Sequence, residues 1–143
     1  MEDKISVLIP QEELEGRIRE MAAQISKDYE GESLHLVCIL RGSIFFTCEL
    51  AKYITVPVTI DFMSVSSYGD GTESTGRIKI MKDLDDPIKD KNVLVVEDII
   101  DSGRTLSHLL SFLKVREPKS LKLCTLLDKP DRRVVDVDVD YVG

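Results

Sequence analysis

Continuous apolar runs alternate with amphipathic segments along this chain. Three runs have few polar interruptions and predict strands buried on both faces, as in a parallel sheet; they cover residues 34–40, 93–96 and 121–127. Residues 56–65 predict another strand. Two further segments carry apolar residues on one helix face: Leu14, Ile18, Met21 and Ile25 in the first, and Leu106, Leu109, Leu110 and Leu113 in the second.

Local signals mark where these elements begin and end. The first helix begins at Pro10 and has Gly31 as a plausible stop. A helix is also expected from residue 43 to about residue 52, and Pro118 follows the helix that carries the leucines. This alternation of strands and helices predicts an α/β fold with a central parallel sheet flanked by helices.

Residues 66–76 are rich in Gly, Ser and Thr and lie between the strand at 56–65 and a returning strand at 77–81. The two strands and the loop predict a long hairpin with a flexible tip. The loop is either a hairpin tip without a function or a lid that closes over a reactive intermediate and excludes water. Residues 135–142 alternate apolar and acidic residues, which is typical of a half-exposed strand.

Composition narrows the class of protein. The 143 residues fit a single domain, 1–143, and the net charge of −7 argues against a nucleic-acid partner. No apolar run approaches the length that spans a membrane, and the N-terminus lacks a signal-peptide pattern. The three cysteines show no metal-binding spacing and predict a reducing, cytoplasmic location.

Three carboxylates follow the apolar run at 93–96: Glu97, Asp98 and Asp101. They are therefore expected near the carboxyl end of a buried strand, where open α/β sheets bind ligands. Carboxylates suit a bound Mg²⁺, sugar hydroxyls or proton transfer, and they do not bind phosphate directly.

The turn after these acids is suited to a phosphate. Gly103 allows the backbone to approach a ligand, and Ser102 and Thr105 offer hydroxyls. The free N–H groups at the start of the following helix favour an anion. A ligand that combines a phosphate, a polyol and a metal ion satisfies the acids and the turn together.

The sequence Glu-Asp-Ile-Ile-Asp-Ser-Gly-Arg-Thr at 97–105 resembles the phosphoribosyl-pyrophosphate motif of the type I phosphoribosyltransferases. The Glu-Asp pair most resembles the hypoxanthine-guanine phosphoribosyltransferases. The resemblance implies that Asp101 is the general base and that Glu97 and Asp98 hold Mg²⁺ and the ribose hydroxyls. The 5′-phosphate site that it implies consists of Asp101, Ser102, Gly103, Arg104 and Thr105.

The resemblance covers three other segments. It makes Leu40, Arg41 and Gly42 the pyrophosphate-binding loop, with a cis peptide between Leu40 and Arg41. The alternative for Arg41 is a plain surface cation. Ser67 and Tyr68 match the lid of the family. The purine site that it implies consists of Lys129, which donates to the exocyclic oxygen, Tyr141, which stacks on the ring, and Val142, whose backbone reads the base edge.

The expected function is purine salvage: hypoxanthine or guanine reacts with phosphoribosyl pyrophosphate to give the nucleoside monophosphate and pyrophosphate. Two alternatives remain open, a nucleotide-sensing regulator with this fold and a transferase that acts on xanthine or a pyrimidine. The family is commonly dimeric or tetrameric. Its members continue beyond the position of Gly143 with another Mg²⁺-binding aspartate, so a C-terminal part is expected to be missing.

Overall fold

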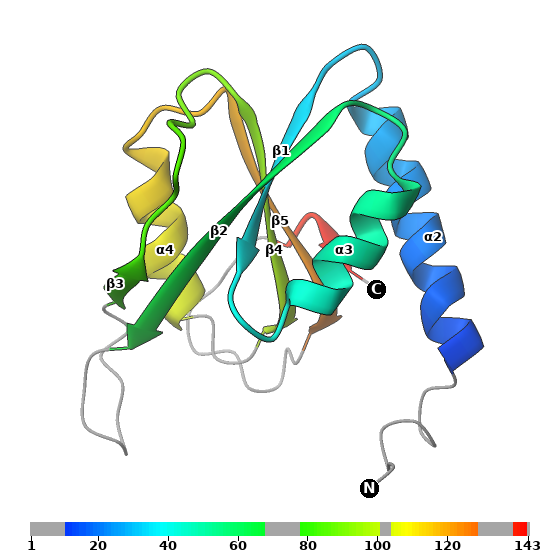
Figure 1. Cartoon of the computed structure of the whole chain (residues 1–143), viewed down its shortest axis with the longest axis horizontal. Helices are drawn as coiled ribbons and strands as arrows, with labels where there is room; N and C mark the ends of the chain where they lie inside the picture. The colour runs from blue at the N-terminus through cyan, green and yellow to red at the C-terminus, as the bar shows by residue number, and fades with distance from the viewer. Residues whose placement is uncertain (1–10, 68–77, 101–103, 129–138, 143) are drawn as a thin grey trace, which may run out of the picture.

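The computed structural model describes residues 11–67, 78–100, 104–128 and 139–142. Three helices and six strands follow one another along these residues (Figure 1). In chain order they are α2 (Gln11–Asp28), β1 (Leu34–Ile39), α3 (Ile44–Tyr53), β2 (Val58–Ser67), β3 (Ile78–Lys82), β4 (Asn92–Ile100), α4 (Arg104–Lys114), β5 (Ser120–Asp128) and β6 (Tyr141–Val142).

The six strands form one sheet in the order β3-β2-β1-β4-β5-β6. Strands β1, β2, β4, β5 and β6 run parallel, whereas β3 pairs antiparallel with β2 because the two form a hairpin. From β1 the chain moves outward through β2 and β3, then returns to β4 and moves the other way. The strand order therefore reverses between β1 and β4, and such switch points are where open α/β sheets bind ligands.

Two apolar cores cover the two faces of the sheet. Helices α2 and α3 lie on one side and α4 on the other (Figure 1). Successive residues of β4 alternate between the cores, as the twofold period of a strand requires: Leu94 and Val96 belong to the first core, and Val93 and Val95 to the second. Because both faces of the central strands are buried, their sequences are continuous apolar runs.

The expected α/β fold is confirmed, and most elements lie within two residues of their predicted bounds. The apolar stripe of α2 faces the core, where Ile18, Met21 and Ile25 are buried, and Gly31 has the left-handed φ of 83° expected at a helix stop. Cys38 and Cys124 are buried, as expected for small core residues, and Cys48 is exposed. Among the described residues, no helix has the length and apolar character needed to cross a bilayer.

Three elements differ from the prediction. Of the strand predicted at 135–142, the structure describes residues 139–142, and among these only Tyr141–Val142 form a strand, since the pairing with β5 covers these two residues. Strand β4 does not end before its acids but continues through Glu97 and Asp98 to Ile100, because β5 pairs with it along this length. Strand β2 likewise extends to Ser67, which pairs with Ile78 of β3. The remainder of the predicted lid, including Tyr68, lies outside the described residues.

The connection from β3 to β4 is held against the sheet. Asp61 of β2 is buried, and its Oδ2 accepts hydrogen bonds from the backbone N–H groups of Asp85 and Asp86, at 2.9 and 3.1 Å. Arg116, just after α4, donates through both terminal nitrogens to the carboxylate of Asp83, at 2.9 and 2.7 Å. The base of the β2–β3 hairpin is thus fixed to both the sheet and the end of α4.

His35 of β1 generates a prediction about acid stability. Its side chain is only 3% exposed, Nδ1 lies 2.6 Å from Thr59 Oγ1, and Nε2 has no partner among the described residues. Burial, and next the charge of Lys91, lower the pKa of His35 below its ordinary value of 6.5. As the pH falls below about 6.5, the unfolded chain therefore takes up a proton that the folded chain resists, and stability is lost.

Replacing His35 by Gln should remove this component of acid sensitivity. We expect the melting temperature of the unaltered protein to fall more between pH 7.5 and pH 5.0 than that of His35→Gln. His108→Gln, which removes the exposed histidine, is the control. Equal losses in the unaltered chain and the His35 variant would contradict the prediction.

Candidate functional site

The carboxyl ends of β1 and β4 meet at the switch point of the sheet. The register pairs Cys38 with Val96, so the residues two positions later on each strand, Leu40 and Asp98, reach the same level. The contact between the two segments is close: a Cβ placed on Gly42 would lie 2.7 Å from Asp98 Oδ2. The structure therefore brings the predicted pyrophosphate loop and the predicted metal-binding acids together.

The loop at 40–42 presents backbone donors. The peptide between Leu40 and Arg41 is cis, which confirms the expectation drawn from the resemblance. The N–H groups of Arg41, Gly42 and Ser43 donate to no residue within the described part of the chain. Helix α3 begins directly after them, and the positive end of its dipole adds to their attraction for an anion. This loop is suited to a phosphate or pyrophosphate group.

Asp98 lies beside this loop, Glu97 precedes it in β4, and both side chains are half-buried. Burial, and next the hydrogen bond with the Asp98 side chain, raise the pKa of Glu97 to about 8. Each carboxylate accepts one backbone N–H: Glu97 Oε1 accepts from Asp98, at 3.1 Å, and Asp98 Oδ1 accepts from Ile99, at 2.8 Å. A carboxylate whose ionisation burial makes costly, followed directly by a second carboxylate, suits a site that a cation completes.

Thr125 of β5 is a supporting residue that the sequence analysis missed. It is fully buried, and its Oγ1 donates to the backbone carbonyl of Asp98, at 3.2 Å. The hydroxyl fixes the backbone of the acid from the neighbouring strand. Nothing in the sequence around Thr125 indicates this role, because it follows from the pairing of Glu97 with Thr125 in the sheet.

The phosphate turn lies only partly within the described residues. Helix α4 begins at Arg104, with Thr105 as its second residue, so the predicted strand before the turn and the predicted helix after it are confirmed. Asp101, Ser102 and Gly103 lie outside the described residues, as does Lys129 on the purine side.

The last described strand, β6, carries the other two purine-site residues. Tyr141 is 7% exposed within the first core, and its hydroxyl donates to Asp28 Oδ2, at 2.6 Å. Burial, and next the hydrogen bond with Asp28, raise the pKa of Tyr141. The carbonyl of Val142 accepts a hydrogen bond from Arg17 Nη2, at 2.7 Å. The stacking role of Tyr141 stays a prediction.

Arg17 and Asp28 of α2 are also residues that sequence reasoning missed, because this helix was assigned only a packing role. Each binds one residue of β6 although more than 110 positions of sequence separate the partners. Their charges lie on the polar part of an amphipathic helix, where charged residues are ordinary. No local signal distinguishes them from surface groups.

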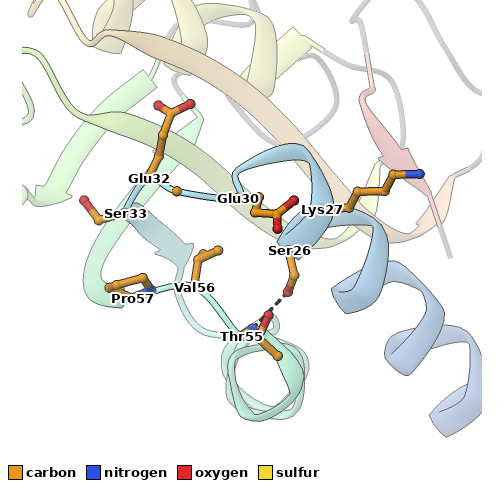
Figure 2. Close-up of a pocket in the computed structure, with 9 residues that line it drawn as sticks. Ser26, Lys27, Glu30, Glu32, Ser33, Thr55, Val56 and Pro57 are labelled. Carbon is orange, nitrogen blue, oxygen red and sulfur yellow. Dashed lines mark hydrogen bonds between the residues drawn. The ribbon is translucent and has the colours of Figure 1, made fainter.

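A groove of about 810 Å³ lies at the opposite ends of the strands, beside the segments that precede β1 and β2 (Figure 2). It is lined by polar and charged residues that include Lys27, Glu30 and Glu32, and Ser26 Oγ accepts the backbone N–H of Thr55 at its wall, at 2.9 Å. In the adjoining groove, Glu32 is paired with Lys119, at 3.0 Å. These grooves do not contain the residues predicted for chemistry.

A doubly wound sheet with a loop suited to phosphate and an acid pair at its switch point is typical of α/β proteins that bind nucleotides. The chain belongs to the phosphoribosyltransferase family, since the model of the phosphoribosyl transferase domain matches residues 8–143. It is thus an enzyme of the transferase class.

Relatives confirm the more specific resemblance. A hypoxanthine phosphoribosyltransferase of Salmonella typhimurium is 51% identical over 100% of this chain and 82% of its own length. A hypoxanthine-guanine phosphoribosyltransferase of Streptococcus thermophilus is 47% identical over 95% of this chain and 76% of its own length. A solved hypoxanthine-guanine phosphoribosyltransferase structure from Bacillus anthracis superposes with a TM-score of 0.91 at 51% identity, covering 94% of this chain and 80% of the other.

Gly42 generates a prediction about the contact between the loop and Asp98. In Gly42→Ala, the added Cβ would meet the Asp98 carboxylate at 2.7 Å, so the loop or the acid must move. We expect turnover to fall by roughly tenfold or more, which corresponds to about 1.4 kcal/mol of lost transition-state stabilisation, with little change in melting temperature.

Gly16→Ala is the matched control, because a Cβ on this glycine of α2 meets nothing within 4 Å. It should stabilise the protein by about 0.5–1 kcal/mol through helix propensity and leave turnover unchanged. Steady-state kinetics and thermal unfolding of the two variants measure the effects on turnover and on stability separately. Normal turnover in Gly42→Ala would show that the approach of Gly42 to Asp98 has no functional importance.

Proposed function

We propose that this enzyme transfers a phosphoribosyl group from phosphoribosyl pyrophosphate to hypoxanthine or guanine and releases pyrophosphate. The observation that carries the proposal is the contact of the 40–42 loop with Asp98 at the switch point of the sheet. The contact brings three backbone donors that have no partner among the described residues next to Asp98 of the acid pair, which is what a ligand with pyrophosphate and sugar hydroxyls requires. The names of the relatives support the choice of base.

The acid pair supports a Mg²⁺ cofactor. A carboxylate next to a pyrophosphate-binding loop repels the ligand unless a cation lies between them, and Asp98 lies directly against Gly42. Glu97 and Asp98 supply the oxygen ligands that Mg²⁺ prefers, and Mg²⁺ typically binds one or two carboxylates together with substrate phosphates. When bound, Mg²⁺ neutralises the charge of the departing pyrophosphate.

The other parts of the reaction are assigned to the segments that follow. Asp101 acts as the general base for the purine ring, and residues 101–105 bind the 5′-phosphate at the start of α4. Lys129, Tyr141 and Val142 bind the purine. Three strand spacings of about 4.8 Å separate β1 from β6, so the whole site extends over about 14 Å. That length suits a nucleotide with pyrophosphate at one end and a base at the other.

Location and assembly complete the proposal. Three free cysteines suit a reducing cytoplasm. We also propose a homodimer or homotetramer. Phe45 at the start of α3 is 84% exposed, and contact with another subunit would remove its apolar surface from water.

The first test is pyrophosphate release from phosphoribosyl pyrophosphate with each of five bases: hypoxanthine, guanine, xanthine, adenine and uracil. We expect release with hypoxanthine and guanine, and a requirement for Mg²⁺. Nucleotide binding without pyrophosphate release would favour a nucleotide-sensing regulator. Release only with xanthine or uracil would assign another substrate to the same site.

A second test concerns Asp101. If this carboxylate moves the proton of the purine ring, Asp101→Asn should lower turnover by roughly 10²–10⁴-fold, the usual contribution of a positioned acid or base. The affinity for phosphoribosyl pyrophosphate should change little, because the amide keeps the size of the side chain. Pre-steady-state turnover and equilibrium binding of that substrate separate the two effects, and near-normal turnover would refute the assignment.

A further inference from the structure

Ser43 has an unusual hydrogen bond for its position in the fold. It is the N-cap residue of α3, where a serine side chain ordinarily accepts a hydrogen bond from a backbone N–H of the first helical turn. Ser43 makes no such capping bond. Its Oγ instead donates backward to the carbonyl of Ile39, the last residue of β1, at 2.5 Å. The hydroxyl thus serves the loop before the helix and not the helix.

The Ser43 hydroxyl is held on a second side by a thiol. Cys38 Sγ lies 3.2 Å from Ser43 Oγ, and both side chains are fully buried. A serine hydroxyl has one hydrogen, and that hydrogen lies on the bond to Ile39. The thiol is therefore the donor to Ser43, and the hydroxyl can take only one orientation.

The bond from Ser43 to Ile39 closes the loop that lies between them. Residues 40–42 are the whole of that loop, and its entrance is fixed by the hydrogen bond from Leu40 N–H to the carbonyl of Met63, at 2.9 Å. At its exit, the N–H of Ile44 donates to the carbonyl of Arg41, at 3.2 Å. Hydrogen bonds therefore hold both ends of the loop whose N–H groups, those of Arg41, Gly42 and Ser43, donate to no described residue.

We propose that Ser43 is a positioning residue that preorganises the 40–42 loop for the pyrophosphate group of the substrate. The inference rests on the proposed function, because it takes this loop as the pyrophosphate site. A loop fixed in its binding arrangement loses less conformational freedom when the ligand binds. A loop fixed in this way also keeps Gly42 against the Asp98 carboxylate.

The test compares Ser43→Ala with the unaltered chain. Removing one hydrogen bond that preorganises a binding loop should raise the KM for phosphoribosyl pyrophosphate roughly 3–10-fold. The KM for hypoxanthine and the melting temperature should stay close to their original values. Calorimetric titration with inorganic pyrophosphate and Mg²⁺ should show the same loss of affinity. Ser43→Thr, which keeps the hydroxyl, should recover most of it.

Two further variants make the result specific. Cys38→Ala withdraws the thiol from Ser43 and leaves the loop sequence intact, so it should raise the same KM by a smaller factor of about 2, as loss of a weaker donor implies. Thr47→Val is the control: it lies one turn later on α3, and its buried hydroxyl has no partner among the described residues. It should leave both KM values unchanged.

An unchanged KM for phosphoribosyl pyrophosphate in Ser43→Ala, with the unaltered chain active, would overturn this inference alone. Equal increases in the KM for both substrates would do the same, because they would indicate a general structural effect. If the unaltered chain released no pyrophosphate with any of the five bases, the proposed function would fail and this inference with it.

Discussion

The pairing of β1 with strands on both of its edges is the constraint on which the rest of the site depends. Hydrogen bonds to β2 and β4 fix β1 in the centre of the sheet, and both of its faces are buried. The chain leaves the sheet at the carboxyl end of β1. Because β1 and β4 belong to different halves of the doubly wound sheet, the segments after them diverge toward α3 and α4. The space between the two helix N-termini is thereby reserved for a ligand.

The groups at the switch point of the sheet attract ligands of opposite charge. Two helix N-termini and a row of unpaired N–H groups favour an anion, whereas Glu97 and Asp98 favour a cation. Neither ligand alone satisfies both groups. Burial, and next the Asp98 side chain, raise the pKa of Glu97, so a nearby positive charge would favour its ionised form.

Support for the site comes from elements that carry no chemistry of their own. Thr125 holds the backbone of Asp98 from β5, and the hydroxyl of Ser43 holds the loop from the start of α3. Helix α2 reaches β6 through Arg17 and Asp28. At the far side of the sheet, Asp61 and the Arg116–Asp83 pair hold the base of the hairpin. All of these polar contacts join elements that the apolar cores also hold together.

The sequence by itself determined the kind of fold and indicated where a site is expected. Buried strands and one-faced helices are encoded in neighbouring residues, so the runs at 34–40 and 93–96 and the leucines of α4 could be recognised directly, as could the acids and the phosphate turn between them. The resemblance added the pyrophosphate loop and its cis peptide.

Only the tertiary structure decided which groups meet. It extended β4 through Glu97 and Asp98, because β5 offered hydrogen-bonding partners along that length. It turned the Ser43 hydroxyl toward Ile39 and joined Arg17 to Val142, 125 residues away. Such contacts depend on strand order and register, which are set by the burial of the whole chain. No local sequence pattern around the residues involved predicts them.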